Sequence, residues 1–370
     1  MSSQVTDLHA VLQWYLPWHK ARVMFISAFI LSLLKVMTVN LTKIANGLNG
    51  GVEKRSNYRR IQRFLALFEV DYLLMAELMV HLLPPHRQWQ VTLDRTTWQF
   101  GGFTINILLV GLVYQGVAFP LFWTLMDKKG NSNTAERIAL MERVLTVLPA
   151  PRIQVLIGDR EFIGQQWFSW LKQHHIPFAI RIRENAQVPS TTHRTQAIRR
   201  RFDDLPIQHQ RILRKPRRIY GHHLYIGALR FADEYVIVVS FQPGSWALEV
   251  YRKRWGIECL FAAFKSRGFD FETTHLNQRE RIEKLIALLA IAFAWAFLVG
   301  RWLAQHKPLK IKKHGRKEQS LFRYGADHLQ YMLLNLETQR EAFEQCVWLL
   351  MIPSIAYGAL SVIRIYAAFS

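Results

Sequence analysis

Four residues in the second half of the chain place a phenol, two cations and a carboxylate at helical spacing. They are Tyr251, Arg254, Glu258 and Lys265. The sequence around them predicts a helix over about 245–266, on which they form a stripe about 60° wide. An ordinary surface ladder of ion pairs is the alternative, because Arg254 and Glu258 are four residues apart.

Two aspartates follow apolar segments that are typical of buried strands. Asp94 ends the run Trp-Gln-Val-Thr-Leu-Asp, and Asp159 ends Ile-Gln-Val-Leu-Ile-Gly-Asp. Ligands bind at the carboxyl ends of the strands in an open α/β sheet. A single aspartate at such a place also starts turns and caps helices, but two on adjacent strands would meet. We expect Glu258 to reach the same edge.

Three carboxylates in one place predict a site for a hard cation. Mg²⁺ prefers oxygen ligands and bridges to phosphate oxygens, and Mn²⁺ is able to substitute. Such ions support in-line displacement at a phosphodiester, with Asp94, Asp159 and Glu258 as ligands. The neighbouring Arg254 and Lys265, with the phenol, would hold phosphate oxygens. The 14 histidines show no metal-type spacing.

The composition agrees with a polyanionic partner. The 370 residues include 48 Lys and Arg against 27 Asp and Glu, a net charge of +21. Half of the residues are apolar, which excludes intrinsic disorder and leaves room for a large core. The two cysteines are too few for a disulfide framework, and they favour a reducing cytoplasmic location.

Hydrophobic periodicity divides the chain into three predicted regions. Residues 1–86 read as an all-helical DNA-binding domain, 87–305 as an α/β core, and 306–370 as a helical C-terminal region. The core begins with three strands, continues as helix, strand, helix, strand, and carries a β-rich insertion at about 185–243. The expected sheet is therefore an antiparallel meander extended by parallel strands.

The N-terminal region contains a possible helix-turn-helix. Residues 40–48 precede a glycine turn, and a basic helix is expected over 56–65 with Ser56 as its N-cap. That helix carries Arg59, Arg60 and Arg63. We predict that these arginines bind DNA, with an ordinary solvated surface helix as the alternative.

One apolar run must be distinguished from a membrane span. Residues 285–300 contain no charge but are flanked on both sides by charged residues. The run is shorter than the roughly 20 residues of a typical span. We therefore expect a helix buried against the catalytic sheet, and no membrane partner.

The motifs together resemble a known family. The spacing Tyr251-x2-Arg254-x3-Glu258-x6-Lys265 is similar to the YREK signature of bacterial insertion-sequence transposases of the IS-four group. The segments Leu-Asp-Arg-Thr-Thr-Trp and Gly-Asp-Arg-Glu-Phe resemble the two aspartate motifs of that family, which belongs to the DDE class.

The resemblance implies an RNase H-like catalytic core and a DNA transposase. Such an enzyme binds the terminal inverted repeats of its own element, cleaves them, and joins the 3′-hydroxyl ends to target DNA, as a homodimer on double-stranded DNA. The three acids would be its catalytic metal ligands. The phenol and the two cations of the signature would contact DNA near the cleaved end.

Other readings remain open from the residues alone. A non-transposing RNase H-like nuclease would share the metal site, and a DNA-binding regulator would need none of the carboxylates. A basic membrane protein would use the run at 285–300 as a span. Glu161 and Asp127 are rival acids, and we expect Glu161 to cap the helix that follows it.

Overall fold

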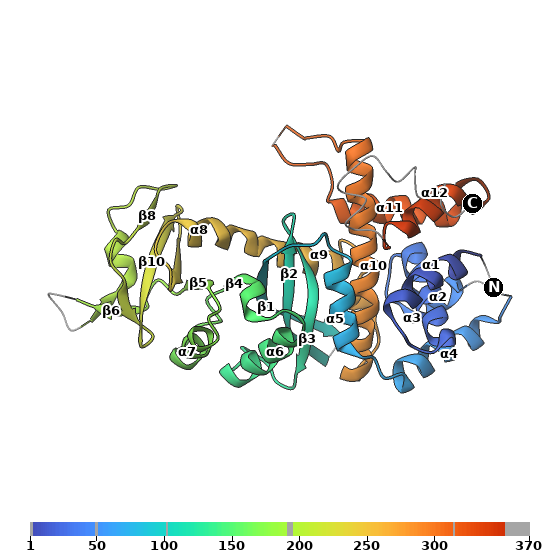
Figure 1. The fold of residues 1–370 in the computed structure, drawn as a ribbon, viewed down its shortest axis with the longest axis horizontal. Helices are drawn as coiled ribbons and strands as arrows, with labels where there is room; N and C mark the ends of the chain where they lie inside the picture. The colour runs from blue at the N-terminus through green and yellow to red at the C-terminus, as the bar shows by residue number, and fades with distance from the viewer. Residues whose placement is uncertain (1–2, 49–50, 101–102, 191–194, 314, 352–370) are drawn as a thin grey trace. The chain divides into compact units, whose positions relative to one another are not determined.

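The computed structural model describes residues 3–351 apart from 49–50, 101–102, 191–194 and 314 (Figure 1). The chain forms two compact units. One comprises residues 86–97 and 105–260, and the other comprises 1–85, 98–104 and 261–370. We call them the sheet unit and the helical unit.

A large mixed sheet organises the sheet unit. Its strand order is β3-β2-β1-β4-β5-β11-β10-β8, and β9 pairs with β10. The strands are β1 (Trp89–Phe100), β2 (Phe103–Tyr114), β3 (Val117–Met126), β4 (Ile153–Gly158), β5 (Phe178–Ile182), β8 (Gln210–Ile212), β9 (Arg217–Ile219), β10 (His222–Arg230) and β11 (Tyr235–Ser240).

The pairing of β1 with β4 fixes the positions of the two aspartates. The strands are parallel, and Leu93 lies opposite Gly158, so Asp94 and Asp159 each follow the last paired residue. Asp94 was expected to end its strand, but β1 continues beyond it to Phe100, because it still pairs with β2 in the sheet order. β4 and β5 are also parallel, whereas β2 and β3 are antiparallel. The expected meander with parallel strands is confirmed. This mixed α/β arrangement is consistent with the RNase H-like core that the resemblance implies.

The insertion is rich in strands, as predicted, but it is not a separate layer. β11 pairs antiparallel with both β5 and β10, so the insertion lengthens the central sheet. Only β6 (Gln187–Pro189) and β7 (Thr195–Ala197) form a small sheet of their own. The apolar strand Tyr235–Ser240 supplies the physical reason, because its buried positions continue the core of the sheet.

Helices surround the strands of this unit. They are α6 (Thr134–Val147), α7 (Gln165–Gln173) and α8 (Trp246–Tyr251), while α9 (Trp255–Phe264) begins in this unit and ends in the helical unit. Asn133 and Glu136 form a reciprocal capping box that starts α6. α8 packs on the sheet through an apolar cluster that includes Leu248, Val155 and Val238.

The helical unit joins the two ends of the chain. Its helices are α1 (Ser3–Tyr15), α2 (Lys20–Val36), α3 (Leu41–Gly47), α4 (Lys54–Leu67), α5 (Tyr72–His81), α10 (Arg279–His306), α11 (Leu321–Leu334) and α12 (Leu336–Trp348). α10 packs against α2, α4, α5 and α11. The predicted core boundary at residue 305 therefore differs from the compact units, because residues 261–305 pack with the N-terminal helices.

The long apolar helix α10 is the core of this unit. It is long and apolar enough to cross a membrane, but 94% of its most apolar window is buried inside the protein. Its burial agrees with the prediction, and within this unit α2, α4, α5 and α11 cover it. The buried Lys284 ammonium donates to the Leu65 carbonyl oxygen at 3.1 Å, which ties α10 to the end of α4.

The two helices of the possible DNA-binding motif are also present. The Asn57 amide of α4 donates to the carbonyl oxygens of Ala45 and Leu48, which fixes α4 against α3. α4 begins at Lys54, two residues before the expected cap at Ser56. The glycine turn is only partly described, since residues 49–50 lie outside the described part of the chain.

Candidate active site

The Arg254 guanidinium joins two of the three predicted acids. It donates to Asp94 Oδ2 at 3.0 Å and to Glu258 Oε1 in a second short contact. The exposed side-chain fractions are 17% for Arg254, 16% for Asp94 and 34% for Glu258. The carboxylates are therefore largely enclosed but open to solvent on one side.

The third acid is held by the phenol of the same signature. The Tyr251 hydroxyl donates to Asp159 Oδ1 at 3.0 Å. The Tyr251 ring is buried on the sheet together with Ile157 and Ala179. Tyr251, Arg254 and the three acids thus form one connected group at the edge of the sheet.

The backbone between these residues departs from the predicted continuous helix. Residues 252–254 form a 3-10 turn between α8 and α9. Tyr251 and Arg254 still lie on one side, because three residues make one full turn of a 3-10 helix. The Arg254 guanidinium carbon lies 5.9 Å from the centre of the Tyr251 ring.

Burial controls the protonation of this group. It raises the pKa of Asp94 to about 6, and the negative Asp159 and Glu161 act in the same direction. Arg254 and the hydrogen bond from the Arg95 amide lower this pKa. Burial also raises the pKa of the Tyr251 phenol. The pKa of Arg254 is raised, because Tyr251 and the three surrounding carboxylates outweigh the effect of its burial.

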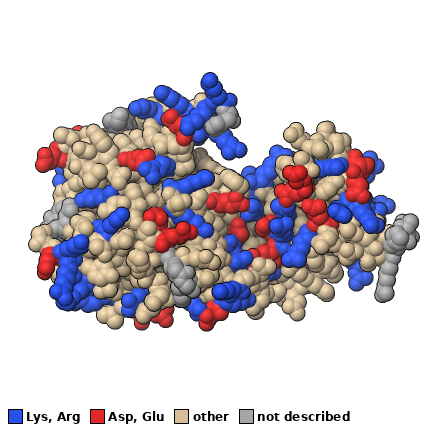
Figure 2. Space-filling view, turned by 180° about the vertical axis from the view of Figure 1, so that it is seen from behind, with Lys and Arg blue, Asp and Glu red and all other residues tan. Residues whose placement is uncertain are grey.

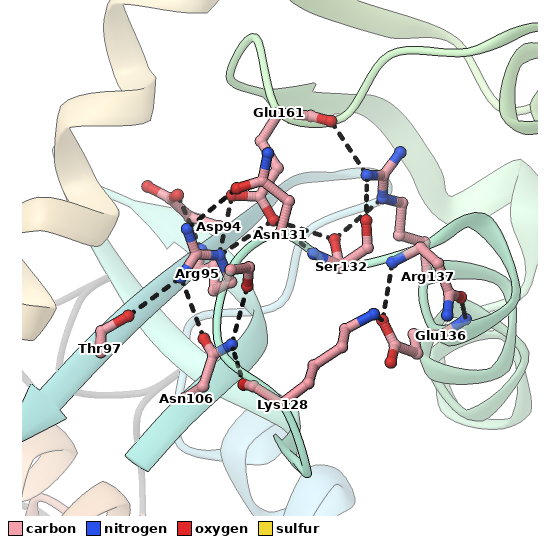
Figure 3. A network of polar contacts seen from close by, with 12 residues as sticks. Asp94, Arg95, Thr97, Asn106, Lys128, Asn131, Ser132, Glu136, Arg137 and Glu161 are labelled. Atoms are coloured by element: carbon pink, nitrogen blue, oxygen red, sulfur yellow. Dashed lines mark hydrogen bonds and ion pairs between the residues drawn. The ribbon is translucent and has the colours of Figure 1, made fainter. Parts of the chain in front are cut away.

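A second network lies directly beside Asp94, and Arg95 is at its centre (Figure 3). The Arg95 amide donates to Asp94 Oδ1 at 2.8 Å, and its guanidinium Nε lies 2.9 Å from Glu161 Oε2. Further guanidinium bonds reach Thr97 and Asn106 at 3.0 Å. Arg95 therefore links the middle of β1 to the segment that follows Asp159.

Glu161 is fixed from two further directions. The amide and the hydroxyl of Ser132 both donate to Glu161 Oε1 at 3.0 Å, and Arg137 donates to the Glu161 carbonyl oxygen. The expectation that Glu161 caps the following helix is wrong, because α7 starts at Gln165 with Gly164 in the capping position. The acid binds the arginine of the neighbouring strand instead. The other rival acid, Asp127, is exposed.

The donor set fits a hard cation in type and charge. Asp94, Asp159 and Glu258 supply carboxylate oxygens only, and the Arg254 guanidinium is bonded to two of them. In the described part of the chain, no group of three or more His, Cys, Asp or Glu side chains has the geometry to hold a metal ion. The physical reason is that the guanidinium occupies the space between Asp94 and Glu258. A bound Mg²⁺ would have to replace it.

The fourth member of the signature lies just beyond the end of α9. α9 ends at Phe264, so Lys265 falls in the turn after the helix and belongs to the helical unit. Its ammonium lies 5.9 Å from the centre of the Trp98 ring. Burial lowers the pKa of Lys265, against the attraction of Glu272.

The predicted DNA-binding arginines lie on α4 of the helical unit. Arg59, Arg60 and Arg63 are all exposed. Arg59 and Arg63 line a shallow recess together with Arg281, and Arg60 lies over the Phe25 ring at 5.7 Å. The structure therefore presents a cationic surface on this helix.

Arg181 is a residue that the sequence reasoning missed. It lies in β5, the strand next to β4, and donates to Glu234 Oε2 at 2.5 Å. Burial lowers the pKa of Arg181, but the hydrogen bond to Glu234 and the nearby Tyr251 and Asp159 raise it above its ordinary value. A single arginine inside the apolar strand Phe-Ala-Ile-Arg-Ile was the available signal.

Comparison with known proteins finds a match to a family model and a match to a solved structure. Residues 121–295 match the family model of the transposase DDE domain. That region includes Asp159 and Glu258, while Asp94 precedes it. No curated protein matches the chain. A cryo-EM structure of the piggyBac transposase synaptic complex with hairpin DNA aligns with a TM-score of 0.46 and 11% identity, over 94% of this chain and 82% of that one.

The Glu161 carboxylate should contribute measurably to stability. Glu161→Gln keeps the size of the side chain but removes the charge that Arg95 binds, so we expect a loss of about 1 to 3 kcal/mol in the free energy of unfolding. Urea unfolding measures it. Asp327→Asn in the exposed Arg323–Asp327 pair is the control, and its effect should stay within about 0.5 kcal/mol. Equal midpoints for both variants would contradict the role of the network.

Replacing Asp94 should have a pH-dependent effect on stability. Its pKa is about 6 in the folded protein against an ordinary value of 3.8, so the buried charge opposes folding fully above pH 6 and not below about pH 4. We expect Asp94→Asn to stabilise the metal-free protein at pH 8 by up to about 3 kcal/mol. The gain should fade as the pH falls through 6. Asp233→Asn, an exposed change in the same unit, should show no such trend.

Proposed function

We propose that this enzyme, which carries a transposase DDE domain, binds the ends of its own insertion element, cleaves them and joins the 3′-hydroxyl ends to target DNA. The observation that supports this most is the convergence of Asp94, Asp159 and Glu258 through Arg254 and Tyr251. From the signature spacing we further propose that the enzyme belongs to the IS-four group.

The three acids are the proposed metal ligands. Bound Mg²⁺, or Mn²⁺ in its place, would activate the attacking hydroxyl and stabilise the leaving oxygen of a phosphodiester. Asp94 and Asp159 suit this role because the parallel pairing of β1 and β4 holds them at one edge. Glu258 completes the set from α9 and is the most exposed of the residues bonded through Arg254.

Arg254 and Lys265 are the proposed contacts to phosphates near the cleaved end. Arg254 bonds two carboxylates, so a DNA phosphate would draw it away from them and open the space between them. Tyr251 was predicted to contact DNA as well. Because it is buried and bonded to Asp159, we propose that it positions that acid instead.

DNA recognition is assigned to two basic regions. Arg59, Arg60 and Arg63 on the exposed side of α4 are suited to base edges in a major groove. The cations at 199–201 and 214–218 in the insertion are suited to phosphates. We also propose that the enzyme acts as a homodimer on DNA, and that it works in the cytoplasm.

A non-transposing RNase H-like nuclease is the second candidate. It would use the same carboxylates but would neither prefer element ends nor join strands. The connected acid group favours both candidates equally, whereas the exposed arginines of α4 favour recognition of specific ends. A strand-joining assay with labelled terminal-repeat DNA separates the two.

Removing any one acid should abolish cleavage without abolishing DNA binding. Asp94→Asn, Asp159→Asn and Glu258→Gln each remove one proposed metal ligand and leave the proposed phosphate contacts in place. We expect the rate of cleavage to fall at least a hundredfold, as it does when single catalytic groups are removed from other enzymes. Gel assays of nicking in Mg²⁺ and Mn²⁺ measure the loss, and anisotropy measures the binding.

Asp127→Asn is the matched control for this series, because Asp127 is an exposed acid of the same unit. It should cleave as the wild type does. Near-normal nicking by one of the three variants would remove that residue from the proposed site.

The arginines of α4 should determine specificity rather than general affinity. Each good contact to a base edge contributes about 1 to 3 kcal/mol of discrimination, so Arg59→Ala with Arg63→Ala should narrow the gap between terminal-repeat and random duplexes at least tenfold. Affinities for both duplexes at two salt concentrations test this. Arg200→Ala with Arg214→Ala in the insertion is the comparison, and it should weaken binding to both duplexes by the same factor. An equal loss on both duplexes for the α4 variant would refute the assignment.

A further inference from the structure

The segment between α10 and α11 projects from the helices of its unit, and its two ends meet at one contact between these helices. A Cβ atom on Gly300 would lie 1.9 Å from the Leu321 carbonyl oxygen, and one on Gly325 would lie 1.8 Å from the Ala296 carbonyl oxygen. The two backbones therefore touch where the segment starts and where it ends. Residues 301–313 and 315–320 form an arm, drawn in orange beyond that contact in Figure 1.

The arm has a defined shape. Its first part is the last turn and a half of α10, which ends at His306. Beyond it, Ile311 bridges Lys317 in antiparallel fashion, and the Glu318 amide donates to the Lys310 carbonyl oxygen at 2.9 Å. The Lys312 amide closes the turn on the Arg316 carbonyl oxygen at 2.8 Å. These bonds make the outer part a short two-stranded ribbon.

The base of the ribbon is anchored in the unit, but its outer part is not buried. Leu309 is 8% exposed, and the Tyr324 hydroxyl donates to the Lys307 carbonyl oxygen at 3.3 Å. Ile311, by contrast, is 63% exposed. The ribbon therefore holds its position without contributing much to the hydrophobic core.

The charge of the ribbon is almost entirely positive. Its six exposed cations are Lys307, Lys310, Lys312, Lys313, Arg316 and Lys317. Glu318 is the one acid between residues 301 and 320. In Figure 2 this segment is the group of blue side chains at the top of the view. Like charges on an ordered ribbon repel one another, so a polyanion would stabilise the arrangement.

We propose that this arm binds the phosphate backbone of duplex DNA without regard to sequence. The choice of DNA as the polyanion rests on the proposed function. A two-stranded ribbon has the right width to follow a major groove, and lysines supply charge without the paired donors that read base edges. A membrane surface suits the arm less well, because Ile311 is its only large exposed apolar side chain in the described residues.

The experiment compares two variants that lose the same charge. The first is Lys310→Gln, Lys312→Gln and Lys313→Gln in the ribbon. The control is Lys20→Gln, Lys129→Gln and Lys172→Gln, three exposed lysines outside the arm. Anisotropy with a random-sequence duplex, without metal, gives the affinity over a series of KCl concentrations. Thermal unfolding checks that both variants fold.

The ribbon variant should lose three phosphate contacts. Each contact contributes about 0.9 to the slope of log affinity against log salt, so the slope should become shallower by about 2 to 3. Affinity at low salt should fall at least tenfold, by the same factor for random and terminal-repeat duplexes. The control should leave the slope within about 0.5 of the wild type. Lys317→Gln alone should change it by about 1 and serves if the triple variant unfolds.

Two results would overturn the proposal. One is a salt slope for the ribbon variant that equals the slope of the control. The other is ribbon-dependent sedimentation with phosphatidylserine vesicles while the DNA slope stays unchanged. Because random DNA and no metal are used, these outcomes are separate from the proposed function, which fails if the wild type neither cleaves nor joins element ends.

Discussion

Three carboxylates gathered at one sheet edge repel one another, and the site depends on how that repulsion is balanced. The parallel pairing of β1 and β4 brings Asp94 and Asp159 together, and no side-chain rearrangement can separate strands that are hydrogen-bonded in register. Arg254 balances part of the charge by bonding Asp94 and Glu258. This guanidinium also fixes the start of α9 against the strand end. Burial is the main reason that the pKa of Asp94 is raised to about 6, and the negative Asp159 and Glu161 add to it.

The Arg95 network gives the acids a rigid support. The Asp94 carboxylate accepts a hydrogen bond from the Arg95 amide, and the Arg95 side chain donates to Glu161, two residues beyond Asp159. The same network takes in Ser132 and Arg137, so the loop before α6 is fixed to the segment after β4 (Figure 3). The partly buried Arg95–Glu161 ion pair positions the proposed metal ligands as much as it stabilises the fold. Arg95 directly follows Asp94, and Glu161 lies two residues after Asp159.

The helical unit solves a different problem, which is how to enclose an apolar helix in a very basic chain. α10 is covered by helices from both ends of the sequence, and its one buried ammonium, on Lys284, has a carbonyl partner. The surplus cations are left on surfaces such as the exposed side of α4 and the arm after α10. A bound polyanion would reduce the mutual repulsion on those surfaces, so the charge distribution links the fold to the proposed DNA partner.

The sequence by itself determined the strands and helices of the core, because their signals are local: apolar runs, turn residues and periodicity. It also pointed to Asp94, Asp159 and Glu258, since strand ends and helical spacing are properties of short segments. The tertiary structure decided what those side chains do in the metal-free protein. Arg254 bonds the acids, Tyr251 is buried against Asp159, Lys265 lies over Trp98, and Glu161 binds Arg95 rather than capping a helix. Each of these depends on which distant segments meet. Ion pairs form between whichever charges the packing brings within reach, and spacing along the chain does not specify that packing.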